Sequence, residues 1–194
     1  MEFLLATSNQ HKADEFNDLF KGSGLLIKAA SSKLEVVEDG LSYFENARLK
    51  AEAYYKKFKV PVLSDDSGLN VIALPSELGI HSARFGEEGL NDKQRAELLL
   101  TKMKEQSFRE AYFSCVLCFY LSPEEVFFFE GRMQGILAHE YRGSTGFGYD
   151  PIFIPNELIA ENQTVAENEV WKSEHSHRAS AVKMAIKFFK ERNS

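Results

Sequence analysis

Two adjacent carboxylates, Asp65 and Asp66, lie in the stretch Val62–Val71 between two apolar runs. Like charges repel, so one surface turn does not need both of them. Adjacent residues that leave a strand point in different directions, and we therefore expect the two side chains to have different roles. Carboxylates from separate segments can hold Mg²⁺ together with substrate phosphates. The stretch predicts either a cation site or only a polar turn at Ser67 and Gly68.

A second acidic run contains Glu35, Glu38 and Asp39 and precedes a predicted helix. Taken alone, this run is typical of a solvated loop. Together with Asp66 on a separate segment, it offers the carboxylate oxygens that Mg²⁺ binds. The residue pattern therefore indicates a metal site without fixing its second ligand.

A polar loop, Thr7–Lys12, connects the first predicted strand to its helix. A helix N-terminus presents unpaired backbone N–H groups and partial positive charge, which favour anions. Lys12 falls in the first turn, where a cation is unfavourable unless an anion offsets it. His177 and Arg178 repeat this arrangement behind Ser176, at the last predicted helix. Each case alone is typical of solvated side chains beside a cap, but the pair makes an anionic ligand more plausible.

A glycine-rich segment, Gly143–Pro151, follows the last long predicted strand and has three glycines within six residues. Glycine lets the backbone approach a ligand closely. Phe147 and Tyr149 offer aromatic faces on which a nucleotide base can stack. A long flexible turn explains the glycines equally well, so both interpretations stay open from this segment alone.

The composition narrows the class of protein. The chain has 194 residues, which suits one domain over residues 1–194, and its formal net charge is −6. An acidic surface does not favour nonspecific binding to nucleic acid or anionic membranes, so we expect neither partner. No targeting or membrane-spanning segment is visible, and we expect a cytoplasmic protein. Cys115 and Cys118 lie three apart in a predicted strand, which points them to opposite faces and predicts buried packing thiols.

The elements that must position these residues alternate between strand and helix patterns, which predicts an α/β fold with a mixed sheet. A capping box, Ser42-x-x-Glu45, opens the second predicted helix, and Ser122–Glu125 joins two long strands as a hairpin loop. Strands are predicted over 2–6, 25–28, 61–63, 69–74, 111–121 and 126–137. The other helices are predicted over 13–21, 91–103 and 178–191.

Seven motifs, in this order along nearly the whole chain, resemble the inosine triphosphate pyrophosphatase family, which removes non-standard purine nucleotides. Each motif is weak singly, but the ordered set is specific. The motifs are Leu5-Ala-Thr-Ser-Asn-x-x-Lys12, Glu38-x-Gly40 with Phe44-Glu-Asn-Ala47, Asp65-Asp-Ser-Gly-Leu69, Gly79-Ile-His-Ser-Ala-Arg84, Gly146-Phe-Gly-Tyr-Asp-Pro-Ile-Phe153, Lys172 and Ser176-His-Arg178.

The resemblance implies a two-lobed α/β fold, with helices flanking a long central sheet and a substrate cleft between the lobes. It also implies a homodimer and Mg²⁺-dependent hydrolysis. The expected substrates are inosine and xanthosine triphosphates with their deoxy forms, and the expected products are the monophosphate and pyrophosphate.

Carried over by position, the resemblance assigns Asp66 as the catalytic carboxylate and metal ligand, with Glu38 as the nearest candidate for the second ligand. The family's metal-binding Glu matches Val37, one residue earlier. The role of Asp65 stays open. The residues expected to bind substrate are Thr7, Ser8, Asn9, Gln10, His11, Lys12, Ser67, Phe147, Gly148, Tyr149, Asp150, Lys172, His177 and Arg178.

Two alternatives stay open beside this function. One is a pyrophosphatase for other modified nucleoside triphosphates, such as modified pyrimidines. The other is a nucleotide-binding sensor that has lost turnover, although retention of Asp66 and Lys12 argues against it. Donors such as His177 and Arg178 suit a 6-oxo purine and would oppose the 6-amino group of adenine, whereas discrimination against guanine follows only from the resemblance.

Overall fold

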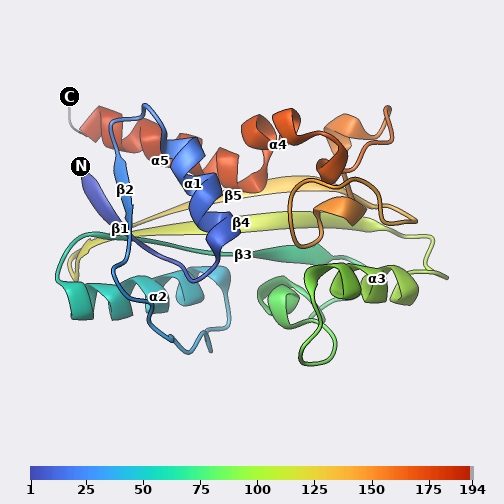
Figure 1. Cartoon of the computed structure of the whole chain (residues 1–194), viewed down its shortest axis with the longest axis horizontal. Coiled ribbons are helices and arrows are strands. Elements are labelled where there is room, and N and C mark those ends of the chain that lie inside the picture. The colour runs from blue at the N-terminus through green and yellow to red at the C-terminus, as the bar shows by residue number, and fades with distance from the viewer. Residues whose placement is uncertain (193–194) are drawn as a thin grey trace. The chain divides into compact units, whose positions relative to one another are not determined.

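The computed structural model describes residues 1–192, which contain a six-stranded sheet of order β2-β1-β3-β4-β5-β6 (Figure 1). β1 pairs in parallel with β2 and with β3, whereas β5 and β6 are antiparallel. The sheet is therefore mixed, as the sequence predicted. The strands are β1 (Glu2–Ala6), β2 (Leu26–Ala29), β3 (Val62–Val71), β4 (Glu110–Ser122), β5 (Glu125–Leu137) and β6 (Phe153–Pro155).

Polar caps fix where the first three helices begin. The side chain of Asn9 accepts a hydrogen bond from Lys12 N at 3.3 Å, that of Ser42 from Glu45 N at 3.2 Å, and that of Asn91 from Gln94 N at 2.9 Å. Each cap satisfies a backbone N–H group that has no partner inside the helix. The α-helices are α1 (Gln10–Phe20), α2 (Tyr43–Phe58), α3 (Asp92–Lys102), α4 (Glu169–His175) and α5 (His177–Arg192).

The described chain forms two compact units, and each is built from segments that are distant in sequence. The first unit comprises Met1–Ser67, Cys115–Gly131 and the chain from His177 onward. The second comprises Gly68–Ser114 and Arg132–Ser176.

The first unit has a layered core with one hydrophobic cluster on each face of its strands. Helices α1 and α5 cover one face and α2 covers the other (Figure 1). Cys115 belongs to the cluster beneath α1 and α5, and Cys118 to the cluster beneath α2. Burial raises the pKa of each thiol to about 12, so both stay protonated and inert. The prediction of packing thiols on opposite faces is confirmed.

The second unit packs its helices around a separate apolar cluster that includes Leu69, Leu99 and Phe153. At its edge the buried guanidinium of Arg109 donates to three backbone carbonyls, those of Met103, Leu137 and Ala138, at 2.5–2.8 Å. A buried cation without a carboxylate partner is tolerated because the carbonyl dipoles meet its donors. This arginine therefore joins the segments of the unit.

Three predicted boundaries are wrong. The strand predicted over 69–74 ends at Val71, where β3 ends. The expected turn at Ser67 and Gly68 is part of β3, which runs without interruption through both aspartates. Local turn propensity was overridden because Ser64, Asp65 and Asp66 are buried and bonded to other segments, so their polarity does not oblige the strand to end. Helix α1 begins at Gln10 rather than at residue 13, because Asn9 caps it. Gln10, His11 and Lys12 are thus helical.

No helix within residues 1–192 is both long enough and apolar enough to cross a membrane.

Candidate active site

Asp65 is the most deeply buried carboxylate of the first unit, with 1% of its surface exposed. Its Oδ2 accepts a hydrogen bond from Lys12 Nζ at 2.7 Å, and the guanidinium of Arg178 lies 3.7 Å away. Burial alone would raise the pKa of this carboxyl, but the positive charges of Lys12, Arg178 and Lys50 outweigh it. The pKa of Asp65 therefore lies well below its usual range, and the side chain is ionised at any physiological pH.

Asp66 has the opposite electrostatic character. Burial raises its pKa to about 6, although the charges of Lys12 and Lys50 oppose that rise. Its Oδ1 accepts a hydrogen bond from Ser67 N at 2.9 Å, and its Oδ2 accepts one from Asn46 Nδ2 at 3.1 Å. A carboxylate with a pKa near neutrality can both bind and release a proton, which suits a general base.

The two aspartates differ because successive residues of a strand face opposite sides of the sheet. Asp65 meets Lys12 on α1 and Arg178 on α5, whereas Asp66 meets Asn46 on α2. The expectation that the two carboxylates have different environments is therefore confirmed.

Lys50 is a charged neighbour of this pair that the sequence reasoning missed. Its Nζ lies 2.8 Å from Glu38 Oε2. Burial lowers the pKa of Lys50, but Asp65, Glu38 and Asp66 more than compensate, so the pKa is raised. A lysine in an amphipathic helix is usually a solvated residue. One sign of this role was present in the sequence: Lys50 lies four residues after Asn46, which places the two side chains on the same face of α2.

Arg178 is 1% exposed and is held by residues of the first unit. Its NH1 donates to Glu15 Oε2 at 2.7 Å and its NH2 to Ser67 Oγ at 3.1 Å. The guanidinium also lies 5.5 Å from the centroid of the Phe16 ring. Sequence reasoning missed Glu15, whose signal was its place three residues after Lys12, on the same face of α1.

We expect Glu15→Gln to lower the free energy of unfolding by about 1–2 kcal/mol, because a neutral amide replaces the charged acceptor of a buried guanidinium. Urea denaturation at neutral pH measures the change. The matched control is Glu2→Gln, which removes an exposed partner of Lys28 and should cost less than about 0.5 kcal/mol. Equal losses in the two variants would contradict the prediction.

The predicted phosphate loop lies at the N-terminus of α1. Thr7 Oγ1 accepts a hydrogen bond from Asn9 N at 3.2 Å, and Lys33 Nζ donates to Ser8 O at 3.2 Å. Gln10 Nε2 donates to Asp14 Oδ1 at 2.8 Å, on the same helix. The loop is therefore shaped by its own side chains and by Lys33. The positive end of α1 lies in this loop and favours an anion, and the ammonium of Lys12 in the first turn is offset by Asp65 at 2.7 Å.

The carboxylates around Asp66 determine how Mg²⁺ could be held there. No group of three or more His, Cys, Asp or Glu side chains within residues 1–192 forms a metal site by itself. Mg²⁺ commonly uses only one or two carboxylates and completes its shell with water and substrate phosphates. Glu38 and Asp66 both act on Lys50, whose positive charge balances them. Glu38 and Asp66 thus supply two carboxylates near Lys50, of the kind that Mg²⁺ uses as ligands.

The second unit holds the other predicted group, Phe147–Asp150 with Lys172. Asp150 Oδ2 accepts hydrogen bonds from Phe147 N and from Lys172 Nζ, both at 2.9 Å. Lys172 Nζ lies 4.5 Å from the centroid of the Phe147 ring. Gly146 has a φ of +75°, and a Cβ atom there would overlap the carboxylate of Asp150. Asp150 therefore shapes the glycine-rich loop and fixes the lysine beside the aromatic ring.

Tyr149 and Asp92 also hold this loop, and of the two Asp92 was not singled out from the sequence. Tyr149 is buried, and its hydroxyl donates to Ser82 O at 2.8 Å. Burial raises the pKa of Tyr149, so the hydroxyl stays a donor. Asp92 Oδ2 accepts a hydrogen bond from Gly148 N at 2.9 Å. The loop thus has defined contacts on both sides of Gly148, which favours a binding loop over a flexible turn.

The predicted site residues consequently fall into two groups, one in each unit. His177 lies in the first unit, 5% exposed, as the first residue of α5, followed by Arg178. The group of the first unit is Thr7, Ser8, Asn9, Gln10, His11, Lys12, Glu38, Asp66, Ser67, His177 and Arg178. The group of the second unit is Phe147, Gly148, Tyr149, Asp150 and Lys172.

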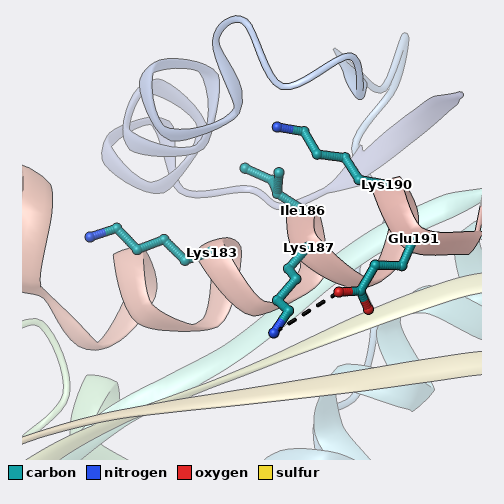
Figure 2. A pocket seen from close by; sticks show the side chains of 5 residues that line it. All are labelled: Lys183, Ile186, Lys187, Lys190 and Glu191. Carbon is teal, nitrogen blue, oxygen red and sulfur yellow. Dashed lines mark ion pairs between the residues drawn. The ribbon is translucent and has the colours of Figure 1, made fainter. Parts of the chain in front are cut away.

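A separate hollow of about 390 Å³ lies along α5, and none of the predicted site residues lines it (Figure 2). Three lysines line it, and the Nζ atom of Lys187 lies 4.0 Å from Glu191 Oε1. Figure 2 marks this ion pair with a dashed line. The lining residues are Lys183, Ile186, Lys187, Lys190 and Glu191.

Comparison with known proteins gives consistent matches over nearly the full length. The sequence model of the Ham1 family matches residues 3–188. The chain belongs to the Ham1 family. A dITP/XTP pyrophosphatase of Malacoplasma penetrans is 39% identical, over 99% of this chain and 100% of its own. One of Bacillus subtilis is 37% identical over 96% of each chain. The resemblance that the motifs indicated is confirmed.

Solved structures of Ham1 proteins share the fold. The Ham1 protein of Staphylococcus aureus has a TM-score of 0.87 and 35% identity, and covers 99% of this chain and 100% of its own. The Coxiella burnetii HAM1 protein has the same TM-score, with 30% identity over 98% and 99% of the two chains. The predicted α/β class, a mixed sheet with flanking helices, is therefore the fold of this Ham1 family member.

Proposed function

We propose that this protein hydrolyses non-standard purine nucleoside triphosphates, namely dITP, ITP and XTP, to the nucleoside monophosphate and pyrophosphate. The observation that carries the proposal is the pair of adjacent aspartates with opposite pKa shifts beside Lys12. Asp65 keeps the cationic groups in place, which leaves Asp66 able to take up a proton. The names of two relatives, both dITP/XTP pyrophosphatases, support the same reaction.

In this reaction Asp66 accepts a proton from water as the water oxygen bonds to the α-phosphorus, the bond from that phosphorus to the bridging oxygen breaks, and pyrophosphate leaves with the bridging oxygen. The general base, Asp66, must stay ionised although it is close to the negatively charged phosphates. A nearby cationic group makes that possible. Lys12 and the N-terminus of α1 bind the triphosphate. When bound by Asp66 and Glu38, Mg²⁺ would offset phosphate charge and favour ionisation of the water.

The purine base of the nucleotide would be recognised by hydrogen-bond donors of the first unit. The guanidinium of Arg178 is fixed by Glu15 and Ser67, and its donors suit the 6-oxo group of hypoxanthine or xanthine. Adenine would place its amino group against a donor, which a buried site rejects by a few kcal/mol. Within the second unit by itself, Phe147 offers a ring for stacking, and Lys172 beside it is suited to contact an electron-rich or anionic group.

A panel of nucleoside triphosphates with Mg²⁺ tests the function. We expect ITP, dITP and XTP to release pyrophosphate, with much slower release from ATP and GTP. Pyrophosphate and orthophosphate are measured separately, and a parallel reaction in EDTA tests the metal requirement. Orthophosphate as the main product would contradict the reaction. Nucleotide binding without any product would favour a sensor, and preference for modified pyrimidines would change the substrate class.

Three further properties remain predictions beside this function. The whole of residues 1–194 is proposed to act as one catalytic domain, as a homodimer, in the cytoplasm. Sedimentation equilibrium of the purified protein measures the oligomeric state, and a monomer at micromolar concentration would contradict the dimer.

A further inference from the structure

Asn46 is a buried amide near the start of α2, with 1% of its surface exposed. Asparagine is a weak helix former, and a buried amide is costly unless its polar atoms have partners. Here both ends have one: Oδ1 accepts a hydrogen bond from Gly40 N at 2.8 Å, and Nδ2 donates to Asp66 Oδ2 at 3.1 Å. One side chain thus joins the coil before α2 to the middle of β3.

The coil approaches Asn46 so closely that only glycine fits at residue 40. A Cβ atom there would lie 2.7 Å from both Asn46 Oδ1 and Glu45 Cβ, well inside van der Waals contact. Glu38 is two residues earlier, so its position depends on where Gly40 is held. Lys50, one turn after Asn46 on the same face of α2, pairs with Glu38 at 2.8 Å. Helix α2 therefore holds residues 38–40, the Glu38 segment, at two points: Asn46 bonds Gly40 and Lys50 pairs with Glu38.

The other end of the amide acts on Asp66. One oxygen of this carboxylate accepts from Ser67 N and the other from Asn46 Nδ2. Two donors from different directions fix the rotation of the carboxylate, and its remaining lone pairs are left for water or a cation. Partners that orient a metal-binding or catalytic group typically change metal affinity or activity by about 10–100-fold when removed.

We propose that Asn46 is a positioning residue that fixes Asp66 relative to the Glu38 segment, so that the two carboxylates bind one cation together. This inference rests on the proposed function, because that function assigns the cation to these carboxylates. Asn46 acts through Asp66 and Gly40 and does not itself contact the nucleotide.

Steady-state kinetics with ITP test the inference in two variants. Each disrupts the connection between Asp66 and the Glu38 segment, one at Asn46 and the other at Gly40. Asn46→Leu removes both hydrogen bonds, and Gly40→Ala displaces the coil while Asn46 is kept. We expect kcat to fall about 10–100-fold in each and KM for ITP to change less than about 3-fold, because Asn46 orients the reacting group and not the nucleotide. Asn17→Leu replaces an exposed helical asparagine of α1 and should leave both constants unchanged.

Binding of Mn²⁺ without nucleotide, measured by calorimetry, gives a readout that does not depend on turnover. We expect Asn46→Leu to weaken Mn²⁺ binding about 10-fold. In an Asp66→Asn background the same change should have no further effect, because the carboxylate that Asn46 orients is already gone. A purely structural role for Asn46 would instead weaken both backgrounds equally or leave both unchanged.

The outcomes separate this inference from the proposed function. Active wild-type protein with unchanged kcat and Mn²⁺ affinity in both variants would overturn the role of Asn46. Wild-type protein that releases no pyrophosphate would overturn the function, while the Mn²⁺ titration still decides the role of Asn46. If Asn46→Leu does not fold, Gly40→Ala, in which the amide and Asp66 are both intact, decides the kinetic result.

Discussion

Asp66→Asn should reduce the release of pyrophosphate from ITP by about 10³-fold or more, because an amide cannot take up the proton of the attacking water. The same change should make the metal-free protein more stable at pH 8. The pKa of Asp66 is raised by burial to about 6, so ionisation at pH 8 opposes folding by about 3 kcal/mol. The amide nitrogen of the introduced asparagine faces a donor, either Ser67 N or Asn46 Nδ2. This conflict offsets about 1 kcal/mol of the gain in stability.

The sign of the stability change can be checked with pH. A carboxyl whose pKa is raised on folding favours the folded state below its unfolded pKa, and this contribution is lost as pH rises through about 6. The gain from Asp66→Asn should therefore be largest above pH 7 and disappear near pH 4, as measured by urea denaturation in EDTA. Calorimetry should show that ITP binding survives. Normal turnover by the variant would show that Asp66 is not the base.

Asp65→Asn should have the opposite effect on stability, with a loss of about 3–5 kcal/mol at pH 7. It removes the buried negative charge that Lys12 contacts at 2.7 Å and Arg178 approaches at 3.7 Å, which leaves two cations poorly balanced. Urea denaturation of the metal-free protein measures the loss. Glu97→Gln, which removes one partner of an exposed helical ion pair, should cost less than about 0.5 kcal/mol.

This loss should also depend on pH. The pKa of Asp65 is lowered on folding, so its contribution is complete above its unfolded pKa, near 4, and declines as pH falls below that value. The difference between wild-type protein and Asp65→Asn should therefore be constant from pH 6 to 8 and shrink at pH 3. An equal difference at both ends of this range would argue against an ionised Asp65 as the cause.

The sequence predicted the elements whose signals are local. Asn91 caps α3 within one residue of the expected start, and Ser42 caps α2, because a capping side chain bonds a backbone group only a few positions away. Cys115 and Cys118 were placed correctly because strand periodicity alone separates them. The candidate site residues that the motifs indicated include both aspartates, Lys12 and Arg178.

The missed parts of the site depend on contacts between distant segments. Glu15 and Arg178 are 163 residues apart in sequence, and Lys50 meets Glu38 across 12 residues. Neither of these sequence separations indicates that the two residues form an ion pair. The uninterrupted course of β3 was missed for the same reason, since the partners that allow aspartates inside a strand come from α1, α2 and α5. The opposite pKa shifts depend on burial, which prevails at Asp66, and on the positive charges of Lys12 and Arg178, which outweigh burial at Asp65; neither was readable from the sequence.

Side chains alternate between the two faces of β3, and this alternation limits where the protein can gain or lose residues. Asp65 and Asp66 face different helices only because one lies at an odd and the other at an even position along the strand. A one-residue deletion between Val62 and Ser64 would bring the carboxylate meant for Asn46 towards Lys12 and Arg178, and would harm folding and hydrolysis together. The hairpin turn at Pro123–Glu124 lies outside β3, so a change of length there leaves the parity of the two aspartates intact. Insertions and deletions among natural variants should therefore be found at that turn and be absent from β3.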